Sequence, residues 1–176
     1  IDFLNAIVSN SGKAKAYSTL NPSSFDPEYL VDKYPHERLE KQSRIISLYE
    51  KMRIDTALTC TPHYLRKPQT GQHLAWAESS AVIYTNSVLG AWTNREGSPS
   101  ALAAALIGKT PNYGMHQAGN RQPSVLVEVE TSLRSEMEYG ALGIHLGKVL
   151  KDRIPVLKGL ANYSDDDLKQ LGAGMA

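Results

Sequence analysis

Cysteine is nearly absent from this chain of 176 residues, whose single thiol lies at Cys60. One cysteine cannot form a disulfide framework, so we expect a reducing, cytoplasmic compartment. No apolar run approaches the roughly 20 residues that a membrane-spanning helix needs. Neither sign of charge dominates, because 19 basic residues are balanced by 18 acidic ones. The composition therefore favours neither nucleic acid nor an anionic membrane as a partner.

Short motifs that mark several large enzyme classes are also missing. The sequence contains no GxGxxG, no P-loop and no GxSxG, which counts against dinucleotide, nucleoside triphosphate and α/β-hydrolase chemistry. No two histidines have the spacing of zinc ligands; His36 and His145 are expected in helices, and His63, His73 and His116 in loops. A lone cysteine cannot hold an iron–sulfur cluster, so such a role requires thiolates from outside this chain.

Strand and helix patterns alternate along the chain and predict a layered α/β fold with one core. Helices are expected at residues 3–8, after Pro35, and at 78–89, 98–107, 139–150 and 165–171. Strands are expected at residues 14–20, 55–60, 124–129 and 154–157. Both ends of the chain run directly into helical patterns, so we expect a piece of a longer protein.

Small, polar and turn-forming residues are concentrated between residues 59 and 114, more densely than a core requires. Cys60 ends a predicted strand just before Thr61 and Pro62. This is the edge at which open α/β sheets usually bind ligands, and a thiolate there can meet a metal or a substrate. The alternative is a small buried hydrophobic residue, the ordinary state of an isolated cysteine.

Two further segments offer polar groups to a small anion. Ser79, Ser80 and the free amides of a helix start can bind a carboxylate or a phosphate, with Glu78 on a hydroxyl or an ordered water. The alternative is that serine caps the helix and Glu78 favours its first turn. Asn21 precedes Pro22 after a predicted strand. Either the Asn21 amide binds a ligand, or the two residues form a simple turn.

Arg95 lies in the loop before a predicted helix start at Ser98 and Pro99. A guanidinium there can clamp an anion through two hydrogen bonds or organise the site. The alternative is a surface pair with a glutamate, which would contribute almost nothing. Nearby glycine and proline indicate a fixed loop, and loops often carry functional residues.

Several strings in this stretch resemble the aconitase X family. They are Cys60-Thr61-Pro62, Trp76-Ala77-Glu78-Ser79-Ser80-Ala81-Val82, Asn86-Ser87-Val88-Leu89-Gly90-Ala91, Thr93-Asn94-Arg95-Glu96-Gly97 and Pro99-Ser100-Ala101-Leu102-Ala103-Ala104-Ala105. Asn21-Pro22 and Tyr139-Gly140-Ala141-Leu142-Gly143 fit the same family, so the resemblance covers nearly the whole chain. Two positions depart from it. Trp92 stands where the family more often has arginine, and Ser98 where glycine is more usual.

The resemblance implies a hydro-lyase with an iron–sulfur cluster, typically 4Fe-4S. In the family three cysteines hold the cluster, and an exposed iron binds the substrate. Cys60 matches the first of these ligands, and the other two are expected outside this chain. Asn21, Pro22, Glu78 and Ser79 match positions that are expected to contact the substrate.

Fold, substrate and partner are implied in the same way. Residues 1–176 are expected to be a single segment of the aconitase X catalytic region, a partial layered α/β sandwich of the aconitase type. The implied reaction removes water from (R)-5-phosphomevalonate and gives an anhydromevalonate phosphate for isoprenoid biosynthesis through the mevalonate pathway. In the family the base is a serine on a small swivelling subunit or domain, which is absent here. We therefore nominate no catalytic residue and expect the isolated chain to be inactive.

Two alternatives stay open. One keeps the family and changes the substrate to cis-3-hydroxy-L-proline. The other is a non-catalytic domain that binds small anions or docks a subunit, with Cys60 merely buried.

Overall fold

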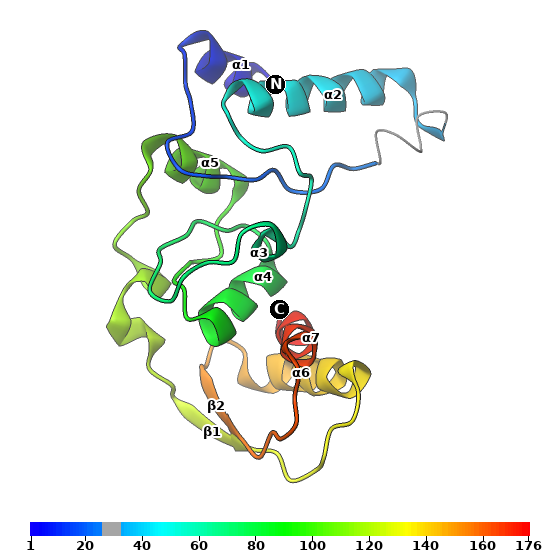
Figure 1. Ribbon diagram of the computed structural model, residues 1–176, viewed down its shortest axis with the longest axis vertical. Coiled ribbons are helices and arrows are strands. Elements are labelled where there is room, and N and C mark those ends of the chain that lie inside the picture. Colours follow the sequence, from blue (N-terminus) through cyan, green and yellow to red (C-terminus); the bar gives the residue numbers. More distant parts are fainter. Residues whose placement is uncertain (26–32) are drawn as a thin grey trace. The chain divides into compact units, whose positions relative to one another are not determined.

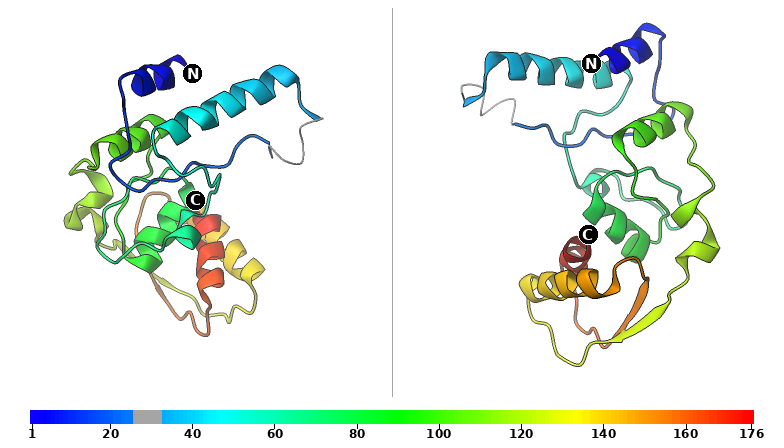
Figure 2. Two further views of the ribbon diagram at one scale, coloured as in Figure 1. Left: turned by 45° about the horizontal axis from the view of Figure 1, so that its top comes forward. Right: turned by 180° about the vertical axis from the view of Figure 1, so that it is seen from behind.

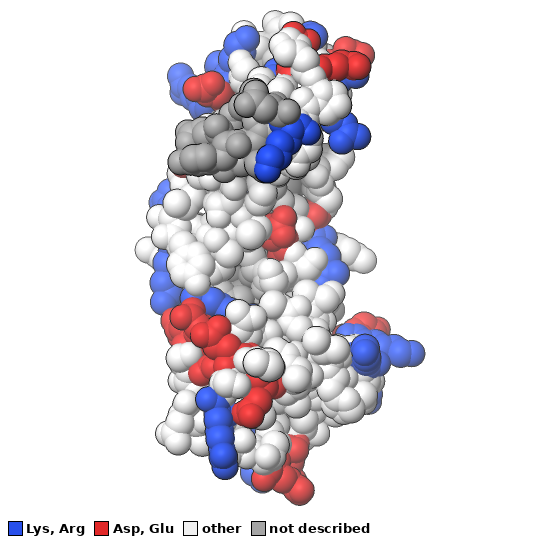
Figure 3. Space-filling view, turned by 90° about the vertical axis from the view of Figure 1, so that its right-hand side faces the viewer, with Lys and Arg blue, Asp and Glu red and all other residues white. Residues whose placement is uncertain are grey.

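The computed structural model describes residues 1–25 and 33–176, which form two compact units. The first unit holds residues 1–62 and 102–109, and the second holds residues 63–101 and 110–176. None of the helices in these described ranges combines the length and the apolar character that a membrane span requires. Basic and acidic side chains both occur on the face drawn in Figure 3, where acidic ones gather in the lower part of the picture. That the chain is a single segment of one catalytic region stays a prediction.

The first unit is built on α1 (Asp2–Ser9), α2 (His36–Lys51) and the last turns of α5 (Ser98–Ile107) (Figure 1). Its core consists of the buried side chains of Leu4, Leu48, Met52, Ile54 and Leu102. All three helices confirm the sequence prediction. Gly108 ends α5 with φ at +69°, a left-handed conformation that a residue with a Cβ rarely adopts.

Neither strand predicted in the first unit forms, although the two segments do approach each other. They meet at a single parallel bridge between Thr19 and Asp55. The backbone amides of residues 14–20 donate hydrogen bonds to carbonyls in separate parts of the unit. Ala14 donates to Met52, Lys15 to Ala105 and Leu20 to Asp55. Leu58 has φ at +49°, which interrupts the extended backbone just before Cys60. The two strand predictions were therefore wrong, although the segments meet at this one bridge.

The second unit contains a two-stranded parallel sheet, β1 (Val125–Glu128) and β2 (Pro155–Lys158). Both strands were predicted, and alternate residues of each are exposed. The partly buried Val125, Val127 and Leu157 pack against the core of α6 (Glu136–Leu150) and α7 (Asp165–Met175). These two helices lie side by side in both views of Figure 2.

Glycines let α6 and α7 approach closely. A Cβ placed on Gly143 would lie 3.0 Å from the Gly174 Cα and would also meet the Leu171 carbonyl. A Cβ on Gly147 would lie 3.0 Å from the Met175 carbonyl oxygen. These contacts explain why α7 continues past the predicted end at residue 171, because Gly174 packs against α6 and Gly172 packs against Ile83 of α4.

The remaining helical elements are short: α3 (Pro62–Leu65), α4 (Ser79–Tyr84), the π-helical turn η2 (Thr85–Leu89), and the 3₁₀ turns η3 (Gly114–His116) and η4 (Ala118–Arg121). The helix predicted at residues 78–89 is thus confirmed as α4 followed by η2. It ends at Gly90, which has φ at +69°. Two histidine predictions were wrong, because His63 lies in α3 and His116 in η3.

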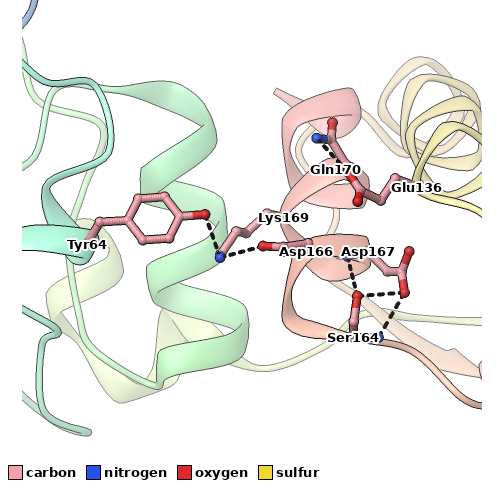
Figure 4. A network of polar contacts seen from close by, with 7 residues as sticks. All are labelled: Tyr64, Glu136, Ser164, Asp166, Asp167, Lys169 and Gln170. Carbon is pink, nitrogen blue, oxygen red and sulfur yellow. Dashed lines mark hydrogen bonds and ion pairs between the residues drawn. The ribbon is translucent and has the colours of Figure 1, made fainter.

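Lys169 joins α7 to α3 (Figure 4). Its ammonium group donates to the Asp166 carboxylate and to the Tyr64 hydroxyl, each at 2.7 Å. These two hydrogen bonds, Asp166 first, raise the pKa of Lys169 above its usual range. At the start of α7 the Ser164 hydroxyl accepts from the Asp167 amide and the Asp167 carboxylate accepts from the Ser164 amide, which together form a capping box.

Candidate active site

The first group of candidate residues lies in the first unit, around one backbone hydrogen bond. The Thr59 amide donates to the Leu20 carbonyl at 3.1 Å. Cys60 follows Thr59 and Asn21 follows Leu20, so the fold brings Cys60 and the Asn21–Pro22 pair to the same place. Asn21 and Pro22 are both exposed. The sequence predicted these residues at the ends of two separate strands; the strands do not form, and the proximity of the two groups is found only in the structure.

Cys60 is an exposed free thiol, which contradicts the interpretation of a buried hydrophobic residue. The Thr59 hydroxyl accepts from the Thr61 amide at 3.0 Å and lies 3.1 Å from the Thr61 hydroxyl. This turn presents the thiol at the outside of the loop. No group of three or more His, Cys, Asp or Glu residues in the described ranges could hold a metal ion. The donor set is therefore a single accessible thiol, which fits one ligand position of an iron–sulfur cluster but not a complete site.

The second group lies in the second unit, on two bridged segments, residues 71–78 and 90–96. They run parallel, with isolated bridges between His73 and Trp92 and between Trp76 and Arg95. Backbone hydrogen bonds of 2.8–2.9 Å join the two segments along their length. The donor amides and their acceptor carbonyls are Gly71 to Gly90, Leu74 to Trp92, Trp92 to Gln72 and Glu96 to Trp76. Since α4 and η2 connect the two segments, the arrangement is a short parallel crossover.

The crossover places Glu78, Ser79 and Arg95 at one edge. Glu78 and Ser79 stand where the first segment passes into α4, and Arg95 lies at the end of the second. The carboxyl ends of parallel segments are where α/β folds usually bind ligands, so the three residues occupy a favourable position. Glu78 takes the cap position of α4, which means that Ser79 begins the helix rather than capping it.

Arg95 is exposed, and none of the acidic side chains that the structure describes forms an ion pair with it. The alternative of a surface pair with a glutamate is therefore not observed. The guanidinium lies at the edge of the crossover with its charge facing solvent. It is placed to meet an anionic group of a ligand.

Sequence reasoning missed the polar network beneath this edge. The Arg121 guanidinium donates to the Asn86 side chain at 2.5 Å and to the Asn86 carbonyl at 3.0 Å. It also lies 4.6 Å from the centre of the Trp92 ring. Burial lowers the pKa of Arg121. Trp92, one of the two departures from the family pattern, thus contacts the Arg121 guanidinium and also the His73 ring, whose centre lies 5.4 Å away.

Two histidines that are 43 positions apart meet beside this network. The Nδ1 atoms of His73 and His116 lie 2.8 Å apart, and their rings are stacked. The His116 Nε2 atom is buried, and no described residue forms a hydrogen bond with it. Burial, and then the neighbouring His73, lower the pKa of His116; Arg121 acts in the same direction and Glu96 opposes it.

Comparison with solved structures establishes the class of fold. The chain superposes on the crystal structure of Thermococcus kodakaraensis aconitase X in its holo-form with a TM-score of 0.88 and 44% sequence identity. The match covers 99% of this chain and 43% of that one. This result confirms the predicted layered α/β fold of the aconitase type, of which the chain forms a part.

Family models identify the sequence more closely. Residues 1–119 match the model of the aconitase X first domain, and residues 123–176 match that of the second domain. The chain belongs to the aconitase X family. The resemblance expected from its motifs is therefore confirmed.

Several curated relatives are similar over the whole chain. The phosphomevalonate dehydratase large subunit of Thermococcus kodakarensis is 45% identical over 99% of this chain and 44% of the relative. That of Methanosarcina mazei is 48% identical over 94% of this chain and 42% of the relative. A cis-3-hydroxy-L-proline dehydratase of Hypocrea jecorina is 35% identical over 94% of this chain and 29% of the relative. The chain thus spans less than half the length of these relatives.

Proposed function

We propose that the chain is the cluster-bearing part of the large subunit of a phosphomevalonate dehydratase. This hydro-lyase would remove water from (R)-5-phosphomevalonate and give an anhydromevalonate phosphate for isoprenoid biosynthesis. The observation that carries the proposal is the exposed Cys60 thiol beside Asn21, in a chain 45% identical to a phosphomevalonate dehydratase large subunit.

Cys60 is proposed as one thiolate ligand of an iron–sulfur cluster, with 4Fe-4S as the expected type. An exposed loop thiol fits this role, and the remaining ligands would come from parts of the protein outside this chain. When bound, the cluster would supply a Lewis acid for the departing hydroxyl, since hydroxide alone is a poor leaving group.

The residues of the chain itself would bind and orient the substrate. Asn21 and Pro22 would contact it beside the cluster ligand. Ser79 and the first amides of α4 suit an anionic group, because a helix start carries free N–H donors and a positive partial charge. Glu78 would contact a hydroxyl or an ordered water, and Arg95 would pair with a carboxylate or phosphate.

The proton on the adjacent carbon must leave together with the hydroxyl. Since no residue of this chain is nominated as the base, we propose that a small swivelling subunit supplies a serine for this step. The description of the relatives as large subunits supports a smaller partner. The chain alone would then bind but not dehydrate the substrate.

Sequence identity to a second group of relatives supports cis-3-hydroxy-L-proline as the second candidate substrate. Relatives described as cis-3-hydroxy-L-proline dehydratases are 35% and 32% identical to this chain, below the 45% of a phosphomevalonate enzyme. A non-catalytic domain has less support, because the buried Cys60 on which it depends is not observed.

The test is an assay of the complete large subunit together with its small partner, after anaerobic reconstitution with iron and sulfide. Both substrates are offered at matched concentrations, and the alkene product is measured. Turnover of (R)-5-phosphomevalonate with little of cis-3-hydroxy-L-proline supports the proposal. The reverse preference would assign the second substrate, and an iron-loaded complex that turns over neither would refute both.

A further inference from the structure

Arg121 contacts the second bridged segment at the Ala91 carbonyl and at the Trp92 ring. Besides its two bonds to Asn86, its guanidinium donates to the carbonyls of Ala91 and Met115, each at 3.3 Å. Its planar face covers the Trp92 ring. A guanidinium has five N–H donors in a fixed fork, and this geometry uses several of them at once. A lysine ammonium has neither the fork nor the planar face.

The contacts continue from Asn86 to the edge of the crossover. The Asn86 amide donates to the carbonyls of Val82 and Thr93, each at 2.9 Å, and its oxygen accepts from the Thr93 amide at 3.2 Å. Asn86 therefore ties α4 to the second bridged segment. Because Arg121 holds the same oxygen, it fixes the rotamer in which Asn86 can make these three bonds.

Thr93 carries the connection across to the first bridged segment. It is fully buried, and its hydroxyl accepts from the Trp76 amide at 3.1 Å while donating to the Asn94 carbonyl at 2.7 Å. Trp76 stands opposite Arg95 in the bridge and two positions before Glu78. A series of hydrogen bonds thus leads from Arg121 through Asn86 and Thr93 to Trp76, the bridge partner of Arg95.

We infer that Arg121 is a positioning residue for substrate binding: through Asn86 and Thr93 it sets the relative position of Glu78, Ser79 and Arg95. It is not a catalytic residue, since its guanidinium is engaged by protein carbonyls and the Trp92 ring. The inference rests on the proposed function of the same edge. Replacing Arg121 leaves the Asn86 and Ala91 carbonyls without a donor and frees the Asn86 side chain, so the edge should lose its fixed geometry.

The test compares Arg121→Lys with the wild type in the complete, cluster-loaded complex. The control is Arg153→Lys, since Arg153 also donates to backbone carbonyls, those of Val149 and Leu150, but at the end of α6. Iron content, kcat, KM for (R)-5-phosphomevalonate and amide hydrogen exchange in residues 71–78 and 90–96 are measured. We expect Arg121→Lys to raise KM about tenfold with little change in kcat and iron content, and to speed exchange in both segments. Arg153→Lys should match the wild type in KM.

Three results would overturn the inference. In the first, KM is unchanged while the wild type is active. In the second, kcat falls and KM does not, which would place Arg121 in the chemical step. In the third, folded protein and iron are lost together, which would assign Arg121 to the stability of the fold. If the wild-type complex itself turns over no phosphomevalonate, the proposed function fails, and the exchange measurement alone then decides whether Arg121 fixes the segments.

Discussion

The side chain of Asn94 occupies the space that a Cβ would need at Gly114. The Asn94 oxygen accepts from the Met115 amide at 2.7 Å, and Gly114 itself has φ at +58°. A side chain at position 114 would therefore collide with this oxygen and strain the backbone as well. The contact anchors the loop after α5 to the segment that carries Arg95.

Replacing Gly114 by alanine is expected to destabilise the protein by about 1–3 kcal/mol, because strain and steric overlap act together. Urea unfolding measures the change in the free energy of unfolding. Gly119→Ala is the matched control, since no atom lies within 4 Å of a Cβ at that position, and its effect should stay within about 0.5 kcal/mol. Equal effects at the two positions would contradict the contact with Asn94.

Two glycines of α6 should respond to the same substitution with opposite signs. At Gly143 a Cβ would collide with the backbone of α7, so Gly143→Ala should cost about 1–3 kcal/mol. At Gly140 the nearest atom, the Gln170 carbonyl oxygen, lies 4.0 Å away. Gly140→Ala should therefore stabilise the helix by about 0.5–1 kcal/mol, because alanine loses less backbone entropy. Thermal unfolding of both variants measures the difference, and destabilisation at both positions would contradict the described packing.

The pair of His73 and His116 predicts how stability depends on pH. Since burial, His73 and Arg121 lower the pKa of His116 below its usual value of about 6.5, the unfolded chain binds this proton more readily than the folded one. The contribution of His116 to the free energy of unfolding should therefore be fully present above about pH 6.5. It should be lost as the pH falls below about 6.5 towards the lowered pKa. His116→Gln should weaken this dependence. The measurement is the thermal midpoint of both proteins between pH 5 and pH 8, and an identical slope in the variant would refute the assignment.

Local signals allowed much of the fold to be predicted. Ser164 caps α7, Gly108 ends α5 in a left-handed conformation, and valines occupy the strand β1, whose residue ranges were all predicted closely. Each of these signals acts within a few residues, through capping, left-handed backbone or side-chain preference. Local signals of this kind predicted less of the candidate site. Cys60, Asn21, Glu78, Ser79 and Arg95 were proposed from their loop or terminal positions, the resemblance gave all but Arg95 a role, and the structure added their grouping into two sets.

The features that were missed depend on contacts between distant parts of the chain. Asn86 and Arg121 are 35 positions apart, and no local pattern indicates that one orients the other. The strand predicted at residues 55–60 failed for the same reason, because its neighbours bond elsewhere and Leu58 adopts a left-handed conformation. Apolar periodicity reports burial, whereas a ladder requires a partner in register.

The role of Cys60 is tested most directly by the iron and sulfide content of the complete protein after anaerobic reconstitution, for the wild type and for Cys60→Ser. Serine keeps the size and the exposure of the side chain but is a poor ligand for iron. We predict that the wild type holds a cluster with absorption in the visible range. Cys60→Ser should lose most of its iron together with its dehydratase activity. A Cys60→Ser protein that keeps the full iron content, or a wild type that binds none, would contradict the assignment.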